Sequence, residues 1–106
     1  MNLYHFPAGA ELDRLIHLKL FRPKEKEPSP PYSIREDEVS TIAKRLEEVY
    51  ERKIVTGTLR VRPRKYFARY ESGPSTATEV VAETLPLAVC RLAVILMDKY
   101  GPPEAG

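Results

Sequence analysis

The chain has 106 residues, the length of one domain, and it is long enough to bury a single hydrophobic core. Hydrophobic residues make up 42% of it and charged residues 30%, a balance that argues against a chain that stays unfolded. Its 17 basic and 15 acidic side chains leave a formal net charge of +2, so no field of the whole molecule directs it to nucleic acid or to a membrane. We expect one domain over residues 1–106.

The cysteine count and the apolar stretches predict where in the cell the protein lies. The lone cysteine, Cys90, cannot form an internal disulfide and lies in an apolar run, which favours a reduced thiol in a cytoplasmic protein. Residues 1–10 lack the basic start and apolar centre of a secretory signal. The most apolar stretch, residues 85–97, is too short to span a membrane and is interrupted by Arg91.

The first half of the chain predicts two helices and a connector. Apolar residues spaced three and four apart predict a helix over residues 10–21. Four prolines among Lys and Glu predict an extended, exposed connector over residues 22–32. Ser33 and Glu36 form a capping-box pattern, which predicts a second helix from Ser33 to about Arg52. Its apolar stripe consists of Val39, Ile42, Ala43, Leu46, Val49 and Tyr50.

Period-two alternation predicts strands in the second half. Residues 55–62 place Val55, Gly57, Leu59 and Val61 on one face and Thr56, Thr58, Arg60 and Arg62 on the other, which predicts a half-buried strand. After Pro63, an aromatic strand over residues 66–71 is expected to pair with it as a hairpin. The turn at residues 72–75 then leads to a third strand over residues 78–82.

The last predicted element is a helix that Thr84 caps and Gly101 ends, with Pro86 in its first turn. Apolar residues surround its axis and leave Arg91, Asp98 and Lys99 for water, so more than one side must be covered. Either the first helix or a second subunit could cover the outer side. These elements predict an α+β fold with a three-stranded antiparallel meander in the order α-α-β-β-β-α, followed by a flexible tail at 102–106.

The sequence contains no recognisable catalytic or metal-binding motif. Cys90 has no adjacent base in the sequence, and His5 and His17, twelve positions apart, do not form a closely spaced pair of zinc ligands. The scattered glycines form no phosphate loop. We therefore predict a protein that is not an enzyme, without catalytic or metal-ligating residues, without a cofactor and without a small-molecule substrate.

The one concentrated signal is the hairpin at residues 58–70, which combines five cations with aromatic residues and contains no acid. Binders of single-stranded nucleic acid use cations for phosphates and aromatic rings for bases. On that hypothesis the binding residues are Arg60, Arg62, Arg64, Lys65, Tyr66 and Arg69. The alternative, which the sequence alone favours, is that the arginines lie on the solvent-exposed face of the sheet and pair with the acidic residues of the second helix.

Two stretches resemble a known family. They are residues 11–16, Glu-Leu-Asp-Arg-Leu-Ile, and residues 83–91, Glu-Thr-Leu-Pro-Leu-Ala-Val-Cys-Arg. Together with a Pro-Tyr-Ser helix start at residues 31–33, they are similar to the phage ABA sandwich domain of phage and prophage proteins. The resemblance implies an α-β-α sandwich and a phage setting, without a settled activity and without functional residues to carry over.

The last predicted helix is nearly all apolar, and a chain this small has few other elements to cover it, so we expect it to contribute to a protein interface. We expect a phage- or prophage-type accessory protein that acts through protein contacts, as a homo-oligomer or with another protein, through the last helix or the sheet edge. The alternative is a nucleic-acid-binding protein that uses the hairpin at residues 58–70.

Overall fold

The computed structural model describes residues 2–24 and 28–103, and the element order confirms the α+β prediction. The three strands, β1 (Ile54–Leu59), β2 (Lys65–Gly73) and β3 (Thr76–Ala82), form an antiparallel meander in the order β1-β2-β3. The α-helices are α1 (Ala10–Leu15), α2 (Val39–Tyr50) and α3 (Leu85–Tyr100). The remaining helical segments are the 3₁₀-helices η1 (Leu3–His5) and η3 (Glu36–Glu38) and the π-helix η2 (Ile16–Phe21).

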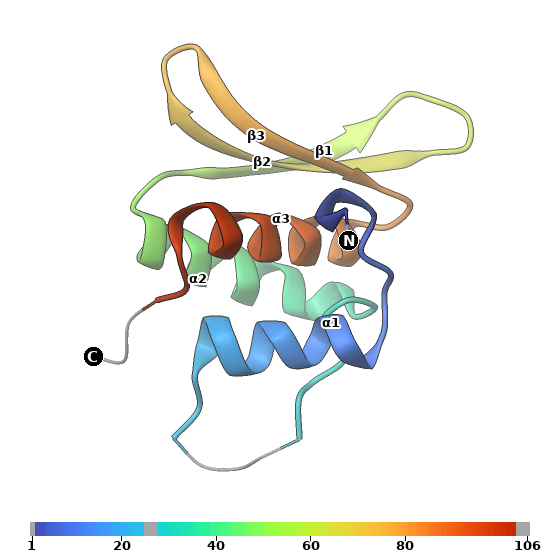
Figure 1. Cartoon of the computed structure of the whole chain (residues 1–106). Coiled ribbons are helices and arrows are strands. Elements are labelled where there is room, and N and C mark those ends of the chain that lie inside the picture. The colour runs from blue at the N-terminus through green and yellow to red at the C-terminus, as the bar shows by residue number, and fades with distance from the viewer. Residues whose placement is uncertain (1, 25–27, 104–106) are drawn as a thin grey trace.

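The layers are ordered sheet, then α3 with α2, then α1 (Figure 1). The sandwich implied by the family resemblance would place the sheet between helices. Here α3 is the middle element instead, because it contacts the sheet on one side and α1 with η2 on the other. One face of the sheet therefore covers the core, and the other has no helix over it in the described part of the chain.

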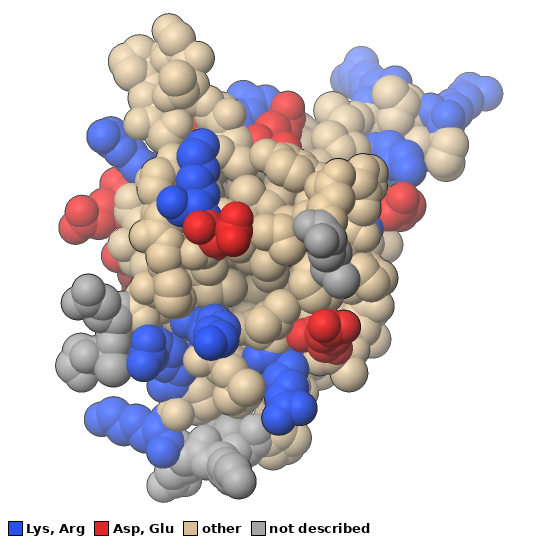
Figure 2. Space-filling model, viewed as in Figure 1, with Lys and Arg blue, Asp and Glu red and all other residues tan. Residues whose placement is uncertain are grey.

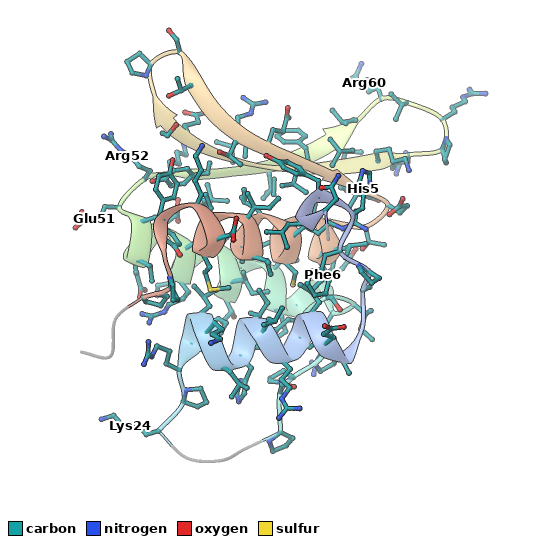
Figure 3. The ribbon with its side chains drawn as sticks, viewed as in Figure 1. His5, Phe6, Lys24, Glu51, Arg52 and Arg60 are labelled. Carbon is teal, nitrogen blue, oxygen red and sulfur yellow. The ribbon has the colours of Figure 1, made fainter. Side chains whose placement is uncertain are left out.

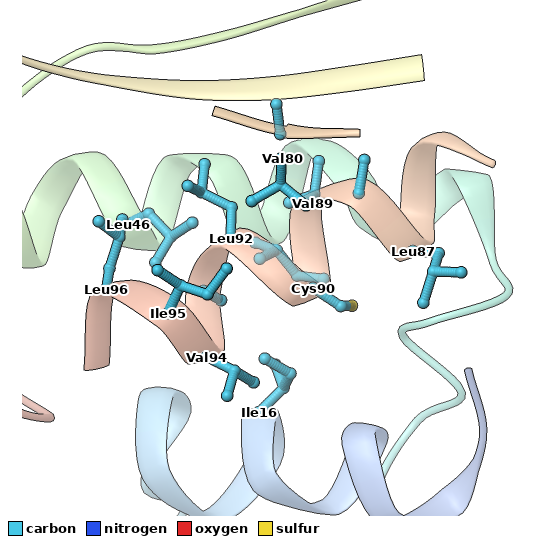
Figure 4. Close-up of a cluster of buried hydrophobic side chains, with 14 of the residues drawn as sticks. Ile16, Leu46, Val80, Leu87, Val89, Cys90, Leu92, Val94, Ile95 and Leu96 are labelled. Carbon is cyan, nitrogen blue, oxygen red and sulfur yellow. The ribbon is translucent and has the colours of Figure 1, made fainter. Parts of the chain in front are cut away.

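Helix α3 is buried along almost its whole length. The Thr84 side chain accepts a hydrogen bond from the Leu87 amide at 3.4 Å, and Gly101 ends the helix with φ of 88°, so the predicted bounds are confirmed. Figure 4 shows Val80 of the sheet on one side of α3 and Ile16 of the first helix on the other. The question left open by the sequence is answered: the first helix, within the same chain, covers the outer side of α3.

The first helix covers residues 10–21 as predicted, but its second half widens into a π-helix. The Arg22 amide donates to the His17 carbonyl at 3.1 Å, five residues earlier. Leu12, Ile16 and Leu20 are fully buried. The predicted connector is not exposed at its end, since Tyr32 is buried and stacks on Phe21 with ring centroids 5.3 Å apart. Residues 25–27 of the connector and 104–106 of the predicted tail lie outside the described residues.

The predicted capping box at Ser33 is wrong. Ser33 lies outside α2 and is fully buried, and its amide donates to Asp13 Oδ1 at 2.7 Å. The Ser33 hydroxyl accepts a hydrogen bond from the Gly9 amide at 3.0 Å. Ser33 therefore stabilises the start of α1 and not the start of α2. The helical residues begin at Glu36 in η3, and the predicted apolar stripe of α2 is confirmed, with Ile42 and Leu46 at its buried centre.

The hairpin and the third strand are confirmed, but the predicted buried face of β1 is wrong. Pairing of Ile54 with Tyr70 and of Thr56 with Ala68 places these residues on the covered side of the sheet. Val55, Gly57 and Leu59 consequently lie on the open side, together with Phe67 and Val81 of the neighbouring strands. The strand also ends at Leu59, so Val61 lies in the following loop and is 50% exposed.

Within the described residues, the apolar stretches of the helices are all too short to cross a lipid bilayer.

Candidate nucleic-acid interface

The β1–β2 loop, residues 60–64, carries the strongest unbalanced charge of the predicted site. Arg60, Arg62 and Arg64 are all exposed, and they line an open hollow of about 740 Å³ with Thr58, Leu59 and Val61. Among the described residues, these three arginines take part in neither an ion pair nor a hydrogen bond. Basic side chains protrude from the body of the molecule at this corner (Figure 2). Figure 3 places Arg60 on the loop, away from the helices.

The two remaining cations of the predicted site are neutralised by neighbouring acids. Lys65 Nζ lies 3.2 Å from Glu83 Oε1, and Arg69 lies 3.5 Å from Glu79 and 3.9 Å from Glu71. The backbone amide of Glu83 and then Lys65 lower the pKa of the Glu83 carboxyl, which keeps this partner ionised. On the sheet, two cations thus face three carboxylates, and the positive charge seen in the sequence remains only in the loop.

The aromatic residues of the hairpin are divided between the two faces of the sheet. Tyr66 and Tyr70 lie on the covered side, where Tyr70 is buried. Phe67 alone lies on the open side, folded over Gly57 so closely that a Cβ there would lie 2.7 Å from Phe67 Cε1. The Arg69 guanidinium lies 5.2 Å from the Phe67 ring centroid. Alternating cations and stacking rings on one surface, as the sequence suggested, are therefore not formed.

The expected pairing of the hairpin arginines with the acidic second helix is also wrong for the described residues. Acids of that region engage other groups: Asp37 pairs with Arg35, Glu48 lies near Arg45, and Glu47 accepts from the Ile54 amide at 3.1 Å. The loop arginines lie beyond the end of β1, so no acid of α2 neutralises them. Sequence reasoning missed Glu79 and Glu83 as partners, because the pairing register of β2 with β3 brings them beside the hairpin.

Groups with catalytic or metal-binding chemistry are dispersed. Burial, with a smaller contribution from Asp13, raises the pKa of the Cys90 thiol, so it stays neutral and packs in α3. His5 is exposed, whereas His17 is buried with its ring centroid 6.3 Å from that of Tyr32. The described residues contain no cluster of three His, Cys, Asp or Glu side chains placed to hold a metal ion.

Comparison with family models, with curated proteins and with solved structures found no match to this chain.

Proposed function

We propose that the protein is a non-enzymatic binding protein whose β1–β2 loop contacts the phosphate backbone of single-stranded nucleic acid. The observation that carries the proposal is the group of three exposed loop arginines without an acidic partner in the described chain. A guanidinium presents a planar set of donors that matches the oxygens of a phosphate. The open hollow between these side chains gives a phosphate access to more than one of them.

The loop supports backbone contacts rather than reading of sequence. Only Phe67 offers a ring on the open face, and Arg69 already lies near that ring. Three arginine–phosphate contacts would make the logarithm of the binding constant fall with the logarithm of salt concentration, with a slope of about −2 for a single strand. We therefore expect weak binding that is tolerant of sequence and strongly dependent on salt.

Protein contacts are the second candidate function, and the open face of the sheet favours them. Val55, Leu59, Phe67 and Val81 are partly or largely exposed there, and no described element covers them. The last helix, which first suggested such contacts, is covered within the chain and offers no free face. A phage-encoded accessory role, in the setting that the family resemblance implies, is compatible with either candidate, and so is the cytoplasmic location that the lone cysteine favours.

The test is fluorescence anisotropy with labelled single- and double-stranded oligonucleotides at two salt concentrations. The variant Arg60→Glu/Arg62→Glu reverses two loop charges, and Arg14→Glu/Arg52→Glu reverses two exposed charges elsewhere. Both variants change the net charge equally. We expect the loop variant to lose single-strand binding and its salt dependence, and the control to keep most of both.

Equal loss in the two variants would show that only net charge matters. Absence of wild-type binding at low salt would contradict the proposal and leave the open sheet face as the surface to investigate.

A further inference from the structure

The free edge of β1 lacks the features that usually protect an edge strand. Its sequence, Ile-Val-Thr-Gly-Thr-Leu, contains no charge and no proline. The only irregularity of register in the sheet lies between β2 and β3, at Glu71 and Gly73. Six residues without a charge, a proline or a bulge form an edge to which another strand can add.

Two hydrogen bonds show which backbone groups of this edge point outward. The Lys53 carbonyl accepts from the Glu71 amide of β2, so the odd-numbered residues face β2. The Ile54 amide points the other way and donates to Glu47 Oε2. Because antiparallel strands alternate, the amides and carbonyls of Thr56 and Thr58 also point outward. Within the described residues these two amides have no hydrogen-bond partner.

A groove of about 560 Å³ runs beside this edge, between α2 and the covered face of the sheet. Thr56 and Tyr66 line it from the sheet, Val39 and Ala43 line it from α2, and Leu85 lines it from the start of α3. A strand added to β1 would direct alternate side chains into this groove. The groove is lined by three acids, Glu36, Asp37 and Glu47, and by one cation, Lys44, so its net charge is negative and favours a strand that brings positive charge.

We propose that the occupant is β1 of a second copy, paired antiparallel across a two-fold axis to give a continuous six-stranded sheet. Antiparallel pairing of Thr56 with Thr58 of the second copy brings their outward amides and carbonyls together. The same register places Arg60 of the second copy opposite Ile54, whose amide is held by Glu47. Arg60, which has no acidic partner in the described chain, then lies beside Glu47 of the other copy, once in each half of the dimer.

The backbone pairing of β1 does not depend on nucleic-acid binding, but Arg60 takes part in both proposals, so Thr56 and Thr58 rather than Arg60 decide whether the dimer forms. The first test is the mass of the wild-type protein by sedimentation velocity over a wide range of micromolar concentrations. We expect a monomer–dimer equilibrium. In amide hydrogen exchange, Thr56 and Thr58 should become protected as the concentration rises, while Val55 and Gly57 stay protected throughout. A monomer at every concentration, or a dimer in which Thr56 and Thr58 exchange as freely as in the monomer, would overturn the proposal.

Edge variants locate the interface. Thr56→Lys places a charge on the free edge of β1, and Ala77→Lys places the same charge at an exposed position of β3, on the opposite edge. We expect the first variant to lose the dimer and the second to keep it, with both remaining folded by circular dichroism. A dimer that survives Thr56→Lys lies elsewhere on the molecule and refutes the β1 interface.

Charge exchange tests the register. Glu47→Arg and Arg60→Glu each place like charges together across the proposed interface and should weaken the dimer. The double variant restores an opposite pair and should recover most of the lost affinity. If the two single effects simply add, Arg60 does not lie beside Glu47 of the second copy, and the proposed register is wrong.

Discussion

At the scale of single residues, Arg91 is a buried cation that holds two segments of the chain together. The sequence placed it in water on the polar side of the last helix, but it is only 8% exposed. Its Nε donates to the Phe6 carbonyl at 2.7 Å. Figure 3 shows Phe6 beside the helices, where the N-terminal segment passes over them, and its side chain is buried. Arg91 therefore fixes the N-terminal segment to α3.

Arg91→Met should destabilise the protein, because it retains the apolar stem but leaves the Phe6 carbonyl without its charged donor. Hydrogen bonds to charged groups contribute about 1.5–3 kcal/mol, and we expect a loss in that range in urea unfolding. Arg14→Met, at an exposed position of α1, is the matched control and should change stability little. Equal stability of the two variants would mean that the contact between Arg91 and Phe6 contributes nothing measurable.

At the scale of elements, Ser33 has two possible roles that can be tested against each other: a local cap of the second helix, or a tertiary contact with the start of α1. If it capped the second helix together with Glu36, removing either side chain would cost about the same. In the structure the Ser33 hydroxyl accepts from the partly buried Gly9 amide, a tertiary contact, while Glu36 is exposed.

Ser33→Ala should therefore lower the free energy of unfolding by about 1 kcal/mol, since it leaves the partly buried Gly9 amide without an acceptor. Glu36→Ala should change it by less than about 0.5 kcal/mol. Urea unfolding of both variants compares them directly. A comparable loss in both would favour the capping box and contradict the contact between Ser33 and Gly9.

Elements defined by neighbouring residues could be predicted from the sequence. Thr84, Pro86 and Gly101 mark the bounds of α3, and the spacing of Ile42 and Leu46 gives the buried stripe of α2, because each signal lies within a few turns of chain. Features set by long-range pairing could not. The face of β1 follows from its register with β2, and the partners of Lys65 and Arg69 come from β3 and its end.

The candidate site was consequently half predictable. The exposure of the loop arginines was predictable, but their place in a loop was not, because the alternation predicted a strand as far as Arg62 and β1 ends at Leu59. Whether a strand cation keeps its charge unbalanced depends on which acid the neighbouring strand brings opposite it. Arg69 and Glu79 are ten residues apart in sequence and directly opposite in the sheet, and no periodicity within the hairpin reveals that pairing.

At the scale of the whole molecule, three tyrosines join the ends of elements that are distant in sequence. The Tyr50 hydroxyl, at the end of α2, donates to the Gly101 carbonyl at 2.9 Å, just beyond α3. The Tyr70 hydroxyl of β2 donates to the Tyr50 carbonyl at 3.1 Å. Ring centroids of Tyr50, Tyr70 and Tyr100 lie 5.7–6.2 Å apart. One cluster thus ties both helices to the sheet.

This cluster should make the protein sensitive to alkali. Burial, and then the neighbouring Tyr70, raises the pKa of Tyr50 to about 12, and burial also raises the pKa of Tyr70. An unfolded tyrosine titrates near pH 10. The stabilising contribution is therefore complete below about pH 10 and is lost as the pH rises toward 12, because the unfolded chain releases protons that the folded protein retains.

Urea unfolding at a series of pH values from about 8 to 12 tests this directly. Tyr50→Phe should be less stable than wild type at the lower end, because it lacks the hydrogen bond to Gly101, but its stability should fall less steeply with pH. Ser33→Ala is the control, since it lowers stability without removing a tyrosine and should keep the wild-type slope. If Tyr50→Phe and wild type decline in parallel, Tyr50 does not couple folding to the alkaline titration, and other groups must account for the decline.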